Sequence, residues 1–121
     1  MEEIGQRRRL KLFADLAMVL IAASILFLTL FATSSGPSGP EWIDKFYHAV
    51  AFFVLVFPGA LVHRWAFLWL VPSAILFGAA IEYLQPYFGR SREVADLYAD
   101  IAGILGGVIA GTLVRLWRTS E

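Results

Sequence analysis

The sequence has no cysteine and little charge, and these absences exclude several classes of protein. Without cysteine there is no disulfide framework, no thiolate metal site and no cysteine nucleophile. Neither a phosphate-binding glycine loop nor a zinc-protease signature is present. Charged residues are only 17% of the 121 positions, and ten basic residues balance ten acidic ones. We therefore expect no nucleic acid partner, no resident cofactor and no metal, since no dedicated metal-ligand spacing occurs either.

Apolar residues make up 59% of the chain, and its mean hydropathy is +0.68. Soluble domains are roughly 45–50% apolar, and a soluble protein this small would lack the interior to bury so much apolar surface. Because backbone groups in lipid must bond internally, apolar segments of about 20 residues are predicted to be membrane-spanning helices. Four such segments occur, at about 12–33, 43–62, 65–84 and 94–117. The predicted fold class is all-α, a polytopic membrane protein built as a compact bundle of four transmembrane helices.

The connections between these segments are short, so we expect a single membrane domain over 12–117. An N-terminal segment, 1–11, and a tail, 118–121, flank it. The first apolar segment exceeds the roughly 7–15 residues of a signal-peptide core, and we expect it to be a retained helix. Asp15 lies four residues after Lys11, which predicts an interfacial ion pair between them.

The basic residues are distributed unevenly between the two ends of the predicted bundle. Cytoplasmic loops of membrane proteins carry an excess of Lys and Arg. Three of the ten basic residues, Lys45, Arg90 and Arg92, fall at one end, and seven fall at the other: Arg7, Arg8, Arg9, Lys11, Arg64, Arg115 and Arg118. This predicts a multi-pass plasma-membrane protein with both termini in the cytoplasm.

Small residues recur every four positions along the fourth segment, at Ala95, Ala99, Gly103, Gly107 and Gly111. Such stripes let two helix backbones approach closely. The third segment has a shorter stripe, Ala74, Gly78 and Glu82, and we expect the two stripes to contact each other and to bring Glu82 against the start of the fourth helix. We favour packing within one chain over homodimerisation, and predict a monomer or a weak homo-oligomer.

Polar residues cluster at the extracytoplasmic ends of the last three segments. Asp44 and His48 share a helix face, as do Asp96 and Asp100, and the third segment adds Glu82. The catalytic candidates are His48, Asp44, Glu82 and Asp100, with Asp44 orienting His48 as a general base. A purely structural polar network is the alternative, since ionisable groups in a membrane must find partners.

Six further residues are candidates for substrate binding: Lys45, Gln85, Arg90, Ser91, Arg92 and Asp96. Two arginines flanking a serine at the membrane surface suit a phosphate or carboxylate group. They could equally be solvated, or paired with Glu93 and Asp96, because exposed ion pairs are common and weak.

The order and spacing of these positions resemble the VanZ-like family, named for a membrane protein associated with teicoplanin resistance. The resemblance covers about 42–117 and rests on three elements: Asp44-Lys45-x-x-His48, Glu82-x-x-Gln85 with Gly89-Arg90-Ser91, and Asp96-x-x-x-Asp100 with Gly103. It implies a small helical membrane protein linked to reduced susceptibility to glycopeptide antibiotics. Family members commonly carry Asn where Asp100 stands here, and no single activity is attached to the family.

Two functions are consistent with these observations. In the first, an outer-leaflet polar pocket binds or modifies an anionic cell-envelope molecule, such as a membrane lipid or a lipid-linked wall precursor. In the second, the protein is a non-catalytic membrane scaffold or partner-binding protein whose polar cluster is structural. Whether it is an enzyme stays open. Proton-coupled transport is disfavoured because the cytoplasmic halves of the last three segments nearly lack charge.

Overall fold

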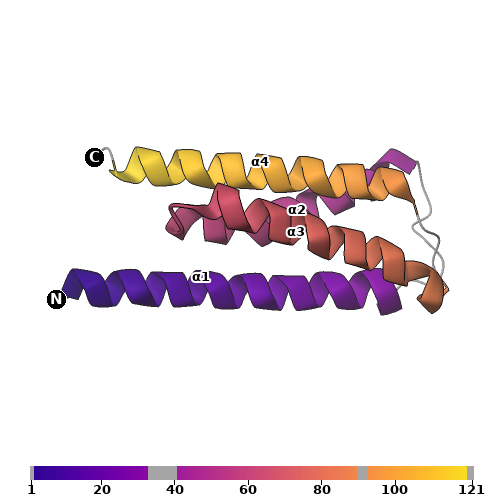
Figure 1. The fold of residues 1–121 in the computed structure, drawn as a ribbon, viewed down its shortest axis with the longest axis horizontal. Helices are drawn as coiled ribbons and strands as arrows, with labels where there is room; N and C mark the ends of the chain where they lie inside the picture. Colours follow the sequence, from indigo (N-terminus) through magenta and orange to yellow (C-terminus); the bar gives the residue numbers. More distant parts are fainter. Residues whose placement is uncertain (1, 33–40, 90–92, 120–121) are drawn as a thin grey trace.

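The computed structural model describes residues 2–32, 41–89 and 93–119, which form a bundle of four long helices (Figure 1). These are α1 (Glu2–Phe27), α2 (Glu41–Val62), α3 (Ala66–Leu84) and α4 (Val94–Thr119). A short π-helix, η1 (Leu28–Ala32), extends α1, and a 3-10 turn, η2 (Gln85–Phe88), follows α3. Both termini and the α2–α3 turn lie at one end, which we call the termini end, and η2 lies at the opposite end.

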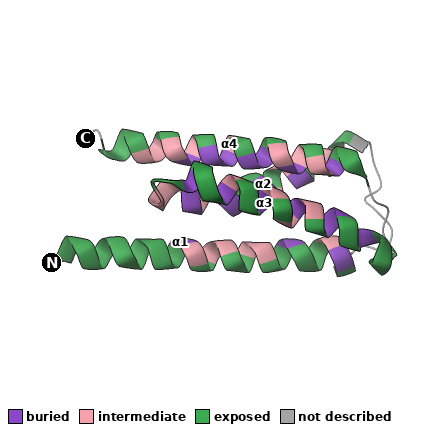
Figure 2. Cartoon of the chain, viewed as in Figure 1, coloured by how far each residue is buried: buried purple, intermediate pink, exposed green. Residues whose placement is uncertain are grey.

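The predicted helix positions agree closely with the structure for α2, α3 and α4. The first helix differs, since it begins at Glu2 and includes most of the segment expected to precede it. Acidic Glu2 and Glu3 in its first turn favour helix formation through the helix dipole. This first part of α1 is exposed along its whole length (Figure 2).

The outer surface of the bundle is apolar, as expected for helices that face lipid. Large aliphatic and aromatic side chains are exposed along all four helices, for example Phe13, Val54, Leu68 and Leu113. An exposed apolar surface of this extent is unusual on a soluble monomer. Within the described residues, four helices are long and apolar enough to cross a membrane. The all-α fold is therefore confirmed, and the four helices have the length and composition expected of a multi-pass membrane protein.

The core lies mainly between α2 and α4. Phe52, Val56 and Ala60 of α2 pack with Ile104 and Val108 of α4, and each of these side chains is at most 1% exposed. Apolar residues of α3 and α1 surround this contact, so α2 is the central helix of the bundle.

The glycine stripe of α4 packs against α2. A Cβ atom added at Gly103 would overlap the carbonyl oxygen of Ala49, and one at Gly107 would lie 2.6 Å from the carbonyl oxygen of Phe53. At Gly111 an added Cβ would lie 2.6 Å from that of Ala60. The prediction that this stripe contacts the stripe of α3 is therefore wrong. A four-residue period fixes which face of a helix is buried, but it does not fix which neighbour covers that face.

Replacing Gly103 with alanine should destabilise the protein, because the added methyl group forces α2 and α4 apart. We expect a loss of about 1–3 kcal/mol in the free energy of unfolding, as is usual for overpacking. Gly106→Ala is the matched control, since its Cβ would only touch the Phe53 ring at 3.4 Å, and its effect should stay within about 1 kcal/mol. Denaturant titration in detergent measures both variants, and equal stability of the two would contradict the close approach at Gly103.

Candidate functional site

All the buried polar or charged side chains of the described residues lie near the end of the bundle opposite the termini. They are His48 of α2, Glu82 of α3, Gln85 of η2, and Asp96 and Asp100 of α4. Residues that are far apart in the sequence, on α2, α3, η2 and α4, thus form one polar cluster, as predicted. Because buried ionisable groups are costly without partners, the cluster requires specific pairing.

His48 and Asp100 form the buried centre of this cluster. The imidazole Nδ1 lies 2.8 Å from Oδ1 of Asp100, which is 1% exposed. An ionised carboxylate only accepts hydrogen bonds, so with Asp100 ionised the Nδ1–H of His48 is the donor of this bond. Nε2 faces Oδ2 of Asp96 at 3.5 Å.

Asp100, and not Asp44, therefore orients His48, which corrects the predicted pairing within α2. The physical reason is the contact between α2 and α4. Ala49 follows His48 directly, and the carbonyl oxygen of Ala49 lies against Gly103, three residues after Asp100. On the α3 side, Gly78 leaves room for the Asp100 carboxylate, since an added Cβ there would lie 3.0 Å from Oδ2.

Lys45 links the outer part of the cluster. Its Nζ lies 2.8 Å from Oδ1 of Asp96, 2.5 Å from Oε2 of Glu93 and 3.9 Å from Oδ2 of Asp44. The Glu93 backbone N–H also donates to Oε2 of Glu82 at 3.0 Å. This joins the end of α3 to the start of α4, so the expected approach of Glu82 to α4 is observed although the glycine stripe packs elsewhere.

Glu93 is the residue of the cluster that sequence reasoning missed as a partner of Lys45 and Glu82. It lies immediately before α4, with its carbonyl accepting from the Asp96 N–H at 3.1 Å. An acid just before a helix was the available signal, because such residues commonly interact with the first turn.

The described part of the cluster has more acids than bases. Lys45 and His48 face five carboxylates: Asp44, Glu82, Glu93, Asp96 and Asp100. Such an environment favours hydroxyl groups, amines or cations over a bare anion. The predicted anion-binding residues Arg90, Ser91 and Arg92 lie outside the described residues.

Two overlapping sets of side chains have the donor types and spacing for a divalent cation. One set is Asp44, His48 and Asp96, and the other is His48, Glu82 and Asp100, with the potential ligand atoms of each set within 4.8 Å of one another. The first set keeps the Asp100–His48 bond intact, as in carboxylate–histidine–metal arrangements. A metal ion there would have to displace the Lys45 ammonium from Asp96.

Gln85 follows Glu82 by three residues and has a buried side-chain amide. Its side chain is 1% exposed, and its Oε1 has no hydrogen-bond partner among the described residues. Leaving such a group unsatisfied typically costs about 1–3 kcal/mol.

A second polar pair lies near the termini end. Nε2 of His63 lies 2.7 Å from Oδ1 of Asp15, so Asp15 pairs with His63 and not with Lys11 as expected. The sequence does not predict this partner of Asp15, because His63 lies in a tight turn and belongs to no helical repeat of polar residues.

Comparisons of the chain with models of protein families, with curated proteins and with solved structures gave no match.

Removing the ammonium of Lys45 should destabilise the fold because Asp96 would remain buried without its cation. We expect Lys45→Met to lower the free energy of unfolding by about 1–3 kcal/mol, and the additional change Asp96→Asn to restore part of that loss. Lys11→Met is the matched control, since Lys11 is exposed and forms no ion pair among the described residues. Strictly additive effects of the Lys45 and Asp96 changes in thermal unfolding would argue against the pairing.

Proposed function

We propose that this protein binds, or acts on, the polar headgroup of an anionic cell-envelope molecule, such as a lipid-linked wall precursor, in the outer leaflet of the plasma membrane. His48 would serve as general base, and the termini would lie in the cytoplasm. The resemblance to the VanZ-like family supports the envelope as the setting, and an effect on teicoplanin susceptibility belongs to the same proposal.

The observation that carries this proposal is the position of the His48 imidazole between carboxylates of α4. Asp100 holds Nδ1 at 2.8 Å, while Nε2 faces Asp96 with Asp44 nearby. Such a pair would suit a general base, in which one carboxylate fixes the ring and stabilises the imidazolium that forms. Nε2 would take a proton from a hydroxyl or amine of the headgroup, or from a water molecule.

Charge and position restrict how such a ligand would bind. The excess of carboxylates around His48 disfavours an anionic group there, and we assign the phosphate or carboxylate to Arg90 and Arg92, which lie outside the described residues. The cluster is near the end of the bundle, at the predicted depth of lipid headgroups. An amphiphile would reach it laterally while its acyl chains stay in the membrane.

The direct test replaces each of the two histidines in turn. We expect His48→Gln to lower turnover of a bacterial envelope lipid extract roughly 100-fold or more, because general-base catalysis contributes about that much. His63→Gln, at the opposite end, is the matched control and should retain wild-type behaviour. Mass spectrometry of lipids bound and converted by the protein in nanodiscs gives the readout for both variants.

A folded His48→Gln variant with unchanged lipid binding and turnover would refute the proposal. If that variant does not fold, Asp44→Asn replaces it, because the Asp44 side chain is 31% exposed and should tolerate the change. The Asp44 and Asp96 carboxylates have ligand atoms within 4.8 Å of one another and of one imidazole nitrogen of His48, so the proposal requires this variant to be impaired as well.

A non-catalytic scaffold is the second candidate function, and the interhelical pairs favour it. Lys45–Asp96 and His48–Asp100 join α2 to α4, and the Glu93–Glu82 bond joins α4 to α3. With this function, His48→Gln would lower the unfolding temperature while every lipid signal stays at the wild-type level.

A further inference from the structure

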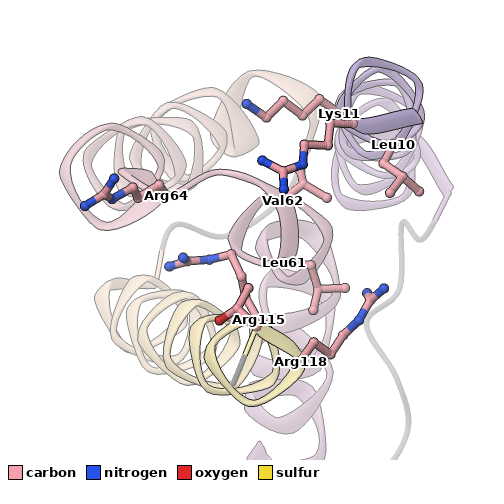
Figure 3. Close-up of a pocket in the computed structure, with 9 residues that line it drawn as sticks. Leu10, Lys11, Leu61, Val62, Arg64, Arg115 and Arg118 are labelled. Atoms are coloured by element: carbon pink, nitrogen blue, oxygen red, sulfur yellow. The ribbon is translucent and has the colours of Figure 1, made fainter. Parts of the chain in front are cut away.

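A second site lies near the termini end of the bundle, far from the acid–imidazole cluster. It is a cavity of about 510 Å³ between the start of α1, the α2–α3 turn and the end of α4 (Figure 3). Five of its nine lining residues are basic, and none is acidic: Arg7, Lys11, Arg64, Arg115 and Arg118, with Leu10, Leu61, Val62 and Thr119. In Figure 3, Lys11 of α1, Arg64 of the α2–α3 turn and Arg115 of α4 come from different elements, and the Arg64 side chain extends away from Val62.

Within the described residues, no carboxylate neutralises the five basic side chains, since none of them forms an ion pair there. Asp15, one turn after Lys11, is bonded to His63. Like charges around one cavity repel each other, so an anion bound there would relieve an unfavourable interaction.

Two of the arginines are held in place by contacts of their own. Arg115 Nε donates to the carbonyl oxygen of Ala60 at 3.2 Å, one of the last four carbonyls of α2, which lack partners within the helix. This leaves its remaining N–H groups available. The Arg64 guanidinium lies 5.3 Å from the centroid of the Trp65 ring, a cation–π distance.

We infer that this cavity binds the phosphate of an anionic membrane phospholipid. Basic pockets between membrane helices are suited to such headgroups, and the volume falls within the roughly 300–1,000 Å³ of ligand pockets. The apolar side chains of Leu10, Leu61 and Val62 suit the glycerol and first acyl carbons, which a soluble phosphate ester would not provide. With both termini in the cytoplasm, the lipid belongs to the inner leaflet.

The spacing of the basic residues along α1 shows that the cavity is more than part of a general excess of positive charge at the termini end. Arg7 and Lys11, four residues apart, line the cavity with Leu10, whereas Arg8 and Arg9 do not. A preference for basic residues on the cytoplasmic side would be met equally by all four positions. The convergence of cations from α1, α4 and the α2–α3 turn on one cavity needs a different reason, and a bound anion supplies it.

The test compares two double variants of the full chain that remove the same charge from the same helix. Arg7→Gln/Lys11→Gln changes the cavity, and Arg8→Gln/Arg9→Gln is the matched control, since all four side chains are exposed. Native mass spectrometry in a neutral detergent gives the affinities for phosphatidylglycerol and phosphatidylcholine. We expect wild type and control to prefer phosphatidylglycerol, and the cavity variant to bind it roughly tenfold more weakly or worse.

Three outcomes would overturn the inference. Equal losses in both double variants would indicate diffuse surface charge and no cavity site. Unchanged binding in the cavity variant, shown to be folded by circular dichroism, would exclude these cations as ligands. Displacement of phosphatidylglycerol by an equal concentration of glycerol phosphate would identify a soluble phosphate ester, and not a lipid, as the ligand.

Discussion

The backbones of α2 and α4 meet at Ala49 and Gly103, where only a glycine leaves room for the carbonyl oxygen of the facing helix. One turn away, this contact brings His48 within 2.8 Å of Asp100. A larger residue at 103 would separate the helices and leave both groups in an apolar environment without each other. The small-residue stripe and the polar cluster are therefore one feature, since close backbone packing between α2 and α4 lets the buried His48–Asp100 hydrogen bond form.

The two ends of the bundle have opposite chemistry and are separated by an apolar core. Acids predominate around His48, and arginines and lysine predominate around the cavity near the termini. Between them, Phe52, Val56 and Val108 are at most 1% exposed, and no buried polar side chain of the described residues lies along that stretch. A proton path across the bundle is disfavoured on this ground, and the two proposed ligands would bind at separate ends of the bundle.

The sequence predicts helices, burial and the polar set well because these depend on local composition and on periods of three to four residues. It predicts less well which helices contact each other, since the rotation of each helix about its axis and the neighbour that it packs against depend on the whole bundle. The stripe of α4 was assigned to α3 but packs on α2, and His48 was paired with Asp44 but bonds Asp100. The excess of positive charge at the termini end is predictable from the sequence. The cavity is not, because it forms only where the start of α1 and the ends of α2 and α4 come together.

The most direct test of this account is a nitrogen-15 NMR measurement of His48 in lipid bilayers. The chain has only two histidines, so a His63→Gln sample assigns the signal. The account predicts a protonated Nδ1 with a through-space correlation to the Asp100 carboxyl carbon. A neutral ring protonated at Nε2, or the absence of that correlation in the folded protein, would contradict it.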